Sequence, residues 1–311
     1  MKRHFAWQLP IAAIALVLSA CSNGDSNTAT DTSSGSPTSG ASTSSSAAAA
    51  PNPLTEKAAV EYKAYAAAQI DELVGAVKVF TDAVRAGDLK AAQEAYAPSR
   101  APWERIEPIA GLVEKIDGKI DARVDDFAGV DDPGFTGWHR LEYLLFEKNT
   151  TEGGAPFADQ LDADIAELKA QFPAVEVKPV DVATGAAELI EEVSEGKITG
   201  EEDRYAKTDL WDFDANVQGA RDAIGKLNPA LVQADPALLG KIEAGINSVY
   251  DTLGPLRRGD GWVLFCTEND PYPSARCPEV TVTPDVIDTL KSELAGLSEN
   301  LSQVSGVLKL Q

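Results

Sequence analysis

The chain has two histidines, His4 and His139, and the second lies in a stretch of closely spaced side chains that are capable of chemistry. His139 precedes Glu142 by three positions within residues 137–146, a run whose composition predicts a helix. Side chains at positions i and i+3 project from the same face of a helix. His139 and Glu142 could therefore converge on one point, as the ligands of a metal ion do.

Carboxylates on neighbouring predicted helices could complete such a site. Glu104 and Glu107 lie three positions apart on an otherwise apolar helix, and Asp121 and Asp125 lie four apart. Helical bundles hold metal ions with carboxylates that project inward from several helices. A solvated surface is the simpler explanation for each acidic pair, and a lone helical histidine is more often a core or capping group than a ligand.

One imidazole with several carboxylates forms a hard set of ligands, and no thioether is available because the single methionine is Met1. This set suits Fe(III), Mn(II) and similar ions better than Cu(I). Zinc binds both histidine and carboxylates, so it is an alternative.

A second stretch, residues 200–216, surrounds aromatic side chains with acids and bases. We expect His139 and Glu142 to lie on one wall of a cleft between helices and this stretch to form the opposite wall, with Arg204, Asp209 and Asp212 as ion-pairing groups. A ladder of salt bridges on the surface is the alternative. Enzymatic motifs are weak by comparison, because the mature chain would lack the second histidine of His-Glu-x-x-His and has no Gly-x-Ser-x-Gly elbow. The sequence therefore predicts a binding protein and not an enzyme.

The elements that must position these residues are helices. Apolar residues recur at helical spacing along residues 54–311, and the first half of the chain shows no convincing β-alternation. Helices are predicted over residues 54–86, 89–96, 102–116, 137–146, 157–172, 183–194, 201–226, 236–253 and 284–308. This pattern predicts an all-α fold, and the length of the chain predicts two packed helical bundles.

Two segments of the chain also resemble each other. Glycine, tyrosine and tryptophan follow one another at nearly the same spacing in both, as Gly87, Tyr96 and Trp103 in the first and Gly196, Tyr205 and Trp211 in the second. This echo predicts an internal duplication, which would place a cleft between two similar halves. A chance similarity between two helix–break–helix units is the alternative.

Residues 1–20 are predicted to be a lipoprotein signal peptide. A positive start precedes an apolar run that is too short to span a bilayer, and Leu18-Ser-Ala-Cys21 resembles a lipobox. Cys21 would then carry the lipid and begin the mature chain, although an ordinary signal peptide with an incidental cysteine is the alternative. Residues 21–53 have the composition of a disordered tether, which leaves residues 54–311 as a helical metal-binding domain.

The formal net charge of −22 disfavours nucleic acid and anionic membrane surfaces as partners and attracts cations. Solubility alone would also explain this charge. After Cys21 the remaining cysteines are Cys266 and Cys277. In an oxidising compartment such a pair is most simply a disulfide that closes a short loop.

The motif Gly137-x-His139-x-x-Glu142 and several longer strings resemble those of a known family. The longer strings are Tyr96–Arg100, Glu104–Ala110, Ile120–Arg123, Asp125–Phe127, Phe135–Glu142, Gly200–Tyr205 and Thr208–Phe213. They resemble the imelysin-like proteins, and among these the iron-uptake lipoproteins of the EfeO and EfeM type. The resemblance is dense over residues 60–225 and looser elsewhere.

The resemblance implies an all-helical fold of two bundles that binds iron, as Fe(III) or Fe(II), at the His-x-x-Glu motif. The ligands that it implies are His139, Glu142, Glu104, Asp121, Glu107 and Asp125. It also implies an extracytoplasmic protein, periplasmic or on the cell surface, that is anchored to the cell membrane by its lipid alone. Such a protein would pass iron to a membrane permease and work with a haem peroxidase, with no nucleic-acid partner.

The chain departs from this pattern in two respects. EfeO proteins carry an N-terminal cupredoxin domain, whereas only the tether precedes the helices here, so the chain is closer to EfeM. The segment with Cys266 and Cys277 has no counterpart in the pattern. Two other functions are alternatives: a metallopeptidase, because imelysin-like proteins have been classed as peptidases, and a protein that binds an acidic polysaccharide through bridging cations.

Overall fold

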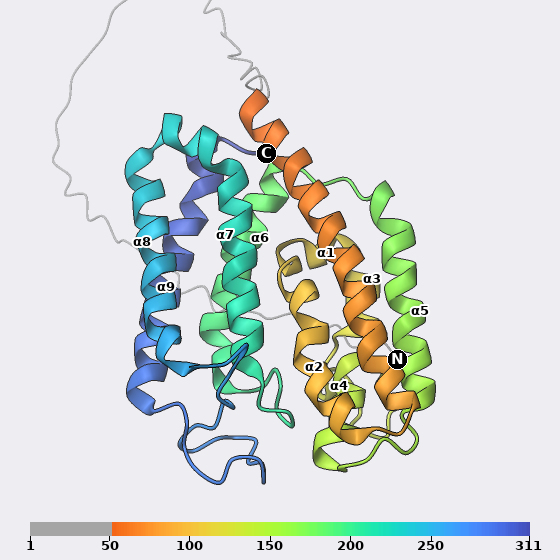
Figure 1. Cartoon of the computed structure of the whole chain (residues 1–311). Coiled ribbons are helices and arrows are strands. Elements are labelled where there is room, and N and C mark those ends of the chain that lie inside the picture. The colour runs from red at the N-terminus through yellow and green to blue at the C-terminus, as the bar shows by residue number, and fades with distance from the viewer. Residues whose placement is uncertain (1–51) are drawn as a thin grey trace, which may run out of the picture. The chain divides into compact units, whose positions relative to one another are not determined.

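Helices make up most of the described part of the chain, residues 52–311 of a computed structural model (Figure 1). The α-helices are α1 (Pro53–Arg85), α2 (Leu89–Glu104), α3 (Glu114–Ile120), α4 (Gly137–Glu142), α5 (Ala155–Gln171), α6 (Pro179–Glu195), α7 (Asp209–Ala234), α8 (Pro236–Leu253) and α9 (Pro284–Leu308). Within residues 52–311 the only paired strands are the antiparallel β1 (Arg257–Arg258) and β2 (Gly261–Trp262). The predicted all-α fold is confirmed.

Short helical turns join or extend these elements. The 3-10 turns are η1 (Glu107–Val113), η2 (Val124–Asp126), η4 (Phe172–Ala174), η5 (Lys197–Thr199) and η6 (Gly254–Leu256), and η3 (Tyr143–Glu147) is a π-helical turn. None of the described helices is both long and apolar enough to cross a membrane. The predicted signal peptide and the predicted lipidation of Cys21 lie outside the described residues.

The helices pack into two bundles (Figure 1). In the first, α1 packs against α2 and α5, while α3 and α4 lie against α5. In the second, α9 packs against α6 and α8, and α6 also packs against α7. Helix α7 contacts α1 and α2 as well, so it joins the two bundles. The predicted pair of bundles is confirmed, and internal duplication stays a prediction.

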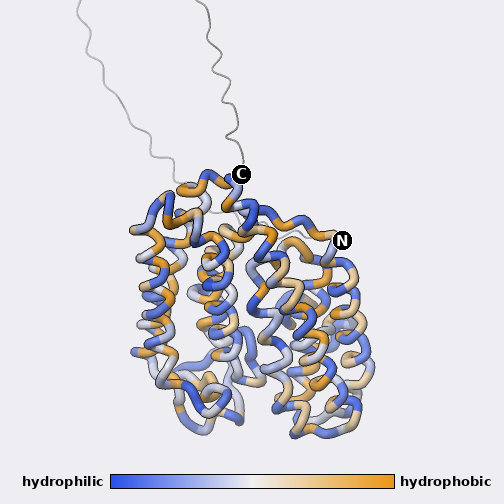
Figure 2. The backbone as a smooth tube through the Cα atoms, turned by 45° about the horizontal axis from the view of Figure 1, so that its top comes forward, coloured by the Kyte–Doolittle hydropathy of each residue, from blue (hydrophilic) through white to orange (hydrophobic). Residues whose placement is uncertain are grey.

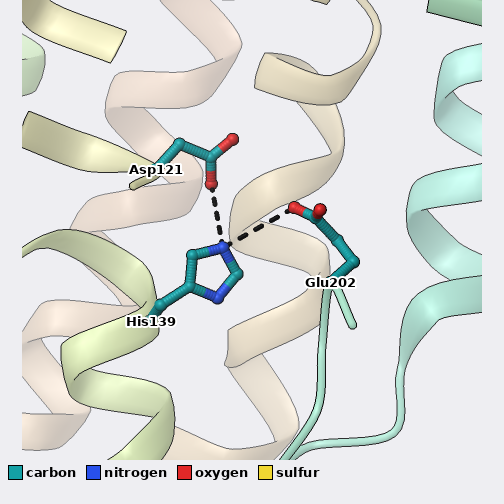
Figure 3. Close-up of side chains that lie close together, drawn as sticks. All are labelled: Asp121, His139 and Glu202. Carbon is teal, nitrogen blue, oxygen red and sulfur yellow. Dashed lines mark ion pairs between the residues drawn. The ribbon is translucent and has the colours of Figure 1, made fainter. Parts of the chain in front are cut away.

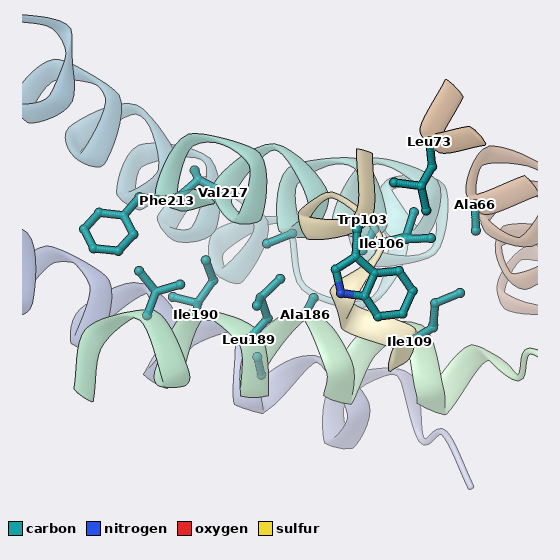
Figure 4. Packing of buried hydrophobic residues seen from close by; sticks show 14 of the residues in the cluster. Ala66, Leu73, Trp103, Ile106, Ile109, Ala186, Leu189, Ile190, Phe213 and Val217 are labelled. Atoms are coloured by element: carbon teal, nitrogen blue, oxygen red, sulfur yellow. The ribbon is translucent and has the colours of Figure 1, made fainter. Parts of the chain in front are cut away.

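The apolar faces of these helices meet in one core. Hydrophobic and hydrophilic residues alternate along the helices (Figure 2), so each helix presents an apolar stripe to its neighbours. Where α1, α2, α6 and α7 come together, Leu73, Trp103, Ile190 and Phe213 are all buried (Figure 4). Any charged group at this level must find its partners inside the protein.

Helix α2 shows that buried contacts can override a local break signal. The sequence predicted one helix that ends at residue 96 and another that begins at residue 102, but α2 continues through Pro98 and Pro102 to Glu104. Each proline removes one helical hydrogen bond. The neighbouring side chains of Tyr96, Arg100 and Trp103 are nevertheless buried, and their contacts hold the helix together.

The predicted helix over residues 201–226 begins later and ends later than expected. Helix α7 spans Asp209–Ala234, and residues 201–208 are irregular. Lys207 has a φ of 58°, and the Thr208 hydroxyl donates a hydrogen bond to Asp203. Side-chain hydrogen bonds of this kind replace the helical ladder, and this irregular segment carries part of the candidate site.

Helix α7 contacts the first bundle at Gly219, which has no side chain. A Cβ at Gly219 would lie 2.3 Å from the carbonyl oxygen of Arg105, so only glycine permits this approach. Gly225 lies on the exposed side of the same helix, and a Cβ there would meet nothing within 4 Å. Gly225 is therefore a suitable control position for a substitution at Gly219.

We expect Gly219→Ala to lower the free energy of unfolding by about 1–3 kcal/mol, because the added methyl group forces α7 away from Arg105. Gly225→Ala should raise it by about 0.5–1 kcal/mol, because alanine loses less backbone entropy than glycine in a helix. Chemical unfolding followed by circular dichroism measures both changes. Equal effects of the two substitutions would contradict the close packing at Gly219.

Candidate metal site

The position of His139 depends on Gly137, the first residue of α4. Gly137 has a φ of +75°, and a Cβ there would lie 2.3 Å from the carbonyl oxygen of Ile120. Glycine therefore lets the start of α4 pack directly on the end of α3. This contact brings His139 beside Asp121, the residue that follows α3, and leaves the histidine only 2% exposed.

The Nε2 atom of His139 faces two carboxylates from different parts of the chain (Figure 3). It lies 3.4 Å from Asp121 Oδ1 and 3.6 Å from Glu202 Oε1. Ligand atoms of these three residues lie within 4.8 Å of one another. An imidazole nitrogen and two carboxylate oxygens in such a cluster can hold a metal ion.

Glu142 contacts the other nitrogen of the imidazole. Its Oε2 lies 3.0 Å from His139 Nδ1, and its Oε1 accepts hydrogen bonds from the backbone N–H groups of Tyr205, at 2.7 Å, and Ala206, at 2.8 Å. His139, Glu142 and Asp203 also form a second group whose ligand atoms lie within 4.8 Å. In this arrangement Glu142 sets the orientation of the ring, as partners of ligand histidines commonly do.

Arg100 of α2 supplies the positive charge at the centre of the cluster. The residue is fully buried, and its guanidinium contacts the carboxylates of Glu104, Asp121, Glu202, Asp203 and Asp212. Its Nη2 lies 2.5 Å from Glu104 Oε1 and 2.6 Å from Glu202 Oε1, and its Nη1 lies 3.3 Å from His139 Nε2. These partners compensate for the lost hydration of the buried charge.

Lys197 supplies a second buried cation. Its Nζ lies 2.9 Å from Glu104 Oε2 and 2.8 Å from Glu107 Oε2. The side-chain amide of Asn216 donates hydrogen bonds to the same two oxygens, at 2.9 Å and 2.8 Å. Glu104 thus bridges Arg100 and Lys197, whereas Glu107 belongs to neither group of ligand atoms that includes His139.

The structure brings some of the predicted ligands together and separates others. Asp121 and His139 meet, and Glu104 contacts the guanidinium that also pairs with Asp121. Asp125 lies apart, because its side chain is 64% exposed and pairs with Arg204. The two acidic pairs that the sequence suggested are thus divided, and one member of each lies in the cluster around Arg100.

Sequence reasoning did not identify Glu202, Asp203, Arg100 or Lys197 as parts of this cluster. Three consecutive acids at 201–203 are typical of a solvated helix start, and nothing in their spacing shows that the segment is irregular and buried. The sequence around Arg100 gave a clearer indication of a buried charge. Arg100 is the one basic residue between Tyr96 and Trp103 on a helix with a buried face.

The surroundings of His139 favour its charged form. Burial and the charge of Arg100 lower the pKa of His139, but hydrogen bonds with Asp121, Glu142 and Glu202 outweigh both and raise that pKa well above its ordinary value. The imidazole therefore carries a proton that an incoming metal ion would have to displace.

Three buried aspartates lie on the α7 side of the cluster. Burial, together with the charge of Asp203, raises the pKa values of Asp209 and Asp212 well above the ordinary value. The Oδ2 atoms of Asp209 and Asp212 are buried and, among the described residues, have no hydrogen-bond partner. The cluster thus holds more carboxylate oxygens than its cations satisfy.

Two cavities with several acidic residues in their walls lie beside the cluster. One, of about 420 Å³, is lined by Asp121 and Glu202 among other residues. A second, of about 380 Å³, shares Glu107, Asp117 and Glu192 with the first. Acidic walls of this kind raise the local concentration of cations, and the first cavity brings them to the carboxylates of Asp121 and Glu202.

A disulfide-closed segment packs on residues 201–208. Cys266 and Cys277 are bonded, with their Cα atoms 5.3 Å apart. Within the loop that they close, Asp270 pairs with the fully buried Lys207 at 2.6 Å. Just before the loop, the backbone N–H of Phe265 donates a 2.8 Å hydrogen bond to the carbonyl oxygen of Lys207.

Two further contacts of this segment fix the same backbone. Arg276 donates a hydrogen bond to the carbonyl oxygen of Ala206, and the ring of Tyr272 lies 4.3 Å from the guanidinium carbon of Arg204. The N–H group of Ala206 is one of the two donors to Glu142. The disulfide-closed segment therefore supports the backbone that holds Glu142, which in turn orients the imidazole of His139.

Residues 58–272 match the family model described as imelysin, peptidase M75. This chain belongs to the imelysin family. It is similar to the iron uptake system component EfeO of Yersinia pseudotuberculosis serotype I (strain IP32953), with 46% identity over 251 residues, and to the protein of the same name from Escherichia coli O157:H7, with 44% identity over 250 residues. Each match covers 80% of this chain but only 63% of the relative, so the chain spans less than two thirds of their length.

The predicted resemblance to the imelysin family is confirmed. The matched region contains the whole cluster from Arg100 to Asp212, so the site lies within the part of the chain that defines the family. The match ends at residue 272, inside the disulfide-closed loop.

Asp117 provides a test of the acidic cavities. Burial, together with the charge of Asp121, raises the pKa of Asp117 to about 7. An acid with a raised pKa in the folded state stabilises the protein at low pH, and this contribution is lost as the pH rises from about 4 through 7. We expect Asp117→Asn to leave the free energy of unfolding nearly unchanged near pH 4 and to raise it at pH 8, by at most about 4 kcal/mol. Unfolding titrations at both values measure this, and a difference independent of pH would contradict it.

The disulfide-closed segment provides another test. Replacing both Cys266 and Cys277 by serine should lower the free energy of unfolding by about 2–3 kcal/mol, because the closed loop is released. It should also speed hydrogen exchange at the amides of Tyr205 and Ala206. Asp270→Asn keeps the disulfide and should change exchange less. Unaltered exchange at these amides in the double variant would show that the segment does not support them.

Proposed function

We propose that this chain binds iron as a cargo ion at His139, Asp121 and Glu202, as a component of an iron-uptake system. The observation that carries the proposal is the convergence of His139 Nε2 with one oxygen from each carboxylate. The relatives support the choice of iron, because both are named as iron uptake system components.

The distances suit a metal ion. Bonds from a metal to nitrogen and oxygen ligands are about 2.0–2.2 Å long, so neighbouring ligand atoms lie about 3 Å apart. The 3.4 Å and 3.6 Å separations from His139 Nε2 to Asp121 and Glu202 are close to this value. Small side-chain movements would close the site around an ion. Glu104, which shares Nη2 of Arg100 with Glu202, is the next carboxylate able to join.

The remaining predicted ligands receive different roles in this proposal. Glu142 holds the ring through Nδ1, so that Nε2 points at the ion, and it would become a ligand itself if an ion bound on the Asp203 side. Glu107 and Asp125 lie outside both groups of ligand atoms that include His139, so neither is assigned as a ligand.

Iron suits this set of ligands better than a soft ion does. One nitrogen and several carboxylate oxygens form a hard site for Fe(III) or Fe(II). Zinc, which accepts the same ligands, would bind as a substitute. The acid-lined cavities favour the approach of either cation.

We further propose that the protein works outside the cytoplasm. A lipid on Cys21 would anchor it to the cell membrane, where it would pass iron to a permease and work with a haem peroxidase. The names of the relatives support membership of an iron-uptake system, and the sequence pattern of residues 1–21 supports the anchor.

Hydrolysis fits the site less well, although the family model carries the name of a peptidase class. A metallopeptidase needs a carboxylate that is free to act as a base beside the metal-bound water. Glu104, Asp121 and Glu202 pair with Arg100 or Lys197, and Glu142 accepts two backbone hydrogen bonds. A cation-bridged polysaccharide would need a cleft lined by basic and aromatic groups, whereas the cavity beside Asp121 and Glu202 is lined mostly by acids, with Arg123 and Phe127 as its basic and aromatic members.

We expect His139→Ala to weaken iron binding by at least tenfold while the helix content stays unchanged, because the variant removes the only nitrogen ligand. Glu202→Gln should weaken binding by a similar factor. Calorimetric titration with Fe(II) in the absence of oxygen, and with Fe(III) supplied as a weak chelate, measures the affinities, and circular dichroism reports the fold.

Asp125→Asn is the matched control, because Asp125 is an acid of the same predicted ligand set that lies outside the cluster. Its affinity for iron should stay within twofold of the unmodified protein. If His139→Ala bound iron as tightly as the unmodified protein, the assignment of the site would be wrong.

A further inference from the structure

The atoms that would bind the cargo ion already surround a cation of the protein itself. The guanidinium of Arg100 pairs with Asp121, lies 2.6 Å from Glu202 through Nη2, and lies 3.3 Å from His139 Nε2 through Nη1. Arginine keeps its proton at any physiological pH. An ion at this position would therefore meet a fixed positive charge within a few ångströms.

The same guanidinium has partners on its other side. Its Nε lies 3.4 Å from Asp212 Oδ1 and 3.7 Å from Asp203 Oδ1. Asp212 Oδ2 is buried and, within the described part of the chain, accepts no hydrogen bond. Asp203 is held in place, because its Oδ1 also accepts a 2.8 Å hydrogen bond from the hydroxyl of Tyr96. Asp212 in particular has capacity for another donor.

We propose that Arg100 is a tethered cation that competes with the cargo ion. It pairs with Asp121 and Glu202 when no ion is bound, and it moves toward Asp203 and Asp212 when an ion takes its place. The inference rests on the proposed function, because it concerns the same site.

Charge balance supports this exchange. Removing a cation from buried carboxylates without replacement is strongly unfavourable, and placing two cations side by side is unfavourable as well. A guanidinium that moves by a short distance avoids both situations, because Asp121 and Glu202 have a positive partner in either state. The competition also weakens ion binding, so that a bound ion can be released to an acceptor.

A direct test follows the Nε–H group of Arg100 by ¹⁵N NMR in the full protein. Ga(III), a diamagnetic ion that resembles Fe(III) in size and charge, is the probe, and Arg100→Lys assigns the signal. Saturation with Ga(III) should shift the Nε–H resonance of Arg100, because its contacts with Asp203 and Asp212 change. A resonance that stays in place while Ga(III) binds would overturn the inference.

A double-mutant cycle tests the destination of the guanidinium. Arg100→Gln should raise the affinity for iron at least tenfold, and Asp212→Asn should lower it at least tenfold. In the Arg100→Gln background, Asp212→Asn should change the affinity less than twofold, because no guanidinium is left to move. A purely electrostatic effect of Asp212 would persist in both backgrounds, and such additivity would overturn the inference.

Asp214→Asn is the matched control for Asp212→Asn. Asp214 is also a buried aspartate of α7, and one of its oxygens has no partner among residues 52–311, but it pairs with Arg257. Its replacement should leave the affinity within twofold. If Arg100→Gln does not fold, the NMR measurement on the unmodified protein decides alone.

The two proposals fail in different ways. The proposed function would be wrong if iron binding did not depend on His139. This inference alone would be wrong if iron binding depended on His139 but the effects of Arg100→Gln and Asp212→Asn on affinity were additive and the Arg100 resonance did not shift.

Discussion

The burial of one guanidinium is the constraint on which the rest of the structure depends. Arg100 is fully buried, and its partners come from α2 itself, the end of α3, the segment before α7 and α7. An unpaired buried charge would cost about 3–5 kcal/mol, so these segments must meet at this point for the chain to fold. The interface between the two bundles is thus specified by charge pairing as well as by apolar burial, and the candidate metal site lies at that interface.

The site is built mostly from short or irregular segments, which need support from elsewhere. Glu202 and Asp203 lie on residues 201–208, whose backbone is held by the disulfide-closed segment through Lys207 and Ala206. His139 lies on a helix of only six residues, which Gly137 fixes to the end of α3. The long helices therefore set the distance between the bundles. Gly137, the disulfide-closed segment and the backbone hydrogen bonds to Glu142 set the positions of the candidate ligands.

The sequence was most informative where a periodic pattern or a rare residue was involved. Helical spacing predicted the all-α fold, and the scarcity of histidine pointed to His139. Spacing alone could not separate Asp121 from Asp125, because one faces Arg100 and the other faces solvent only after the chain turns at the end of α3. It also could not find Glu202, whose role depends on contacts with residues about 60 to 100 positions away in the sequence. Local pattern predicts elements well, whereas buried charge pairs are a property of the tertiary fold.

The surplus of acid in this cluster links metal binding to folding. Burial and mutual repulsion raise the pKa values of Asp209 and Asp212, which means that their ionised forms destabilise the folded state. A bound cation would relieve this repulsion, and an ion at 100 times its dissociation constant stabilises a folded protein by about 2.7 kcal/mol. In the proposed function the protein must also release its ion, so its fold cannot depend on that ion. Arg100 and Lys197 supply the compensating charge from within the chain, so the carboxylates that make the site attractive to a cation do not leave the protein unfolded without one.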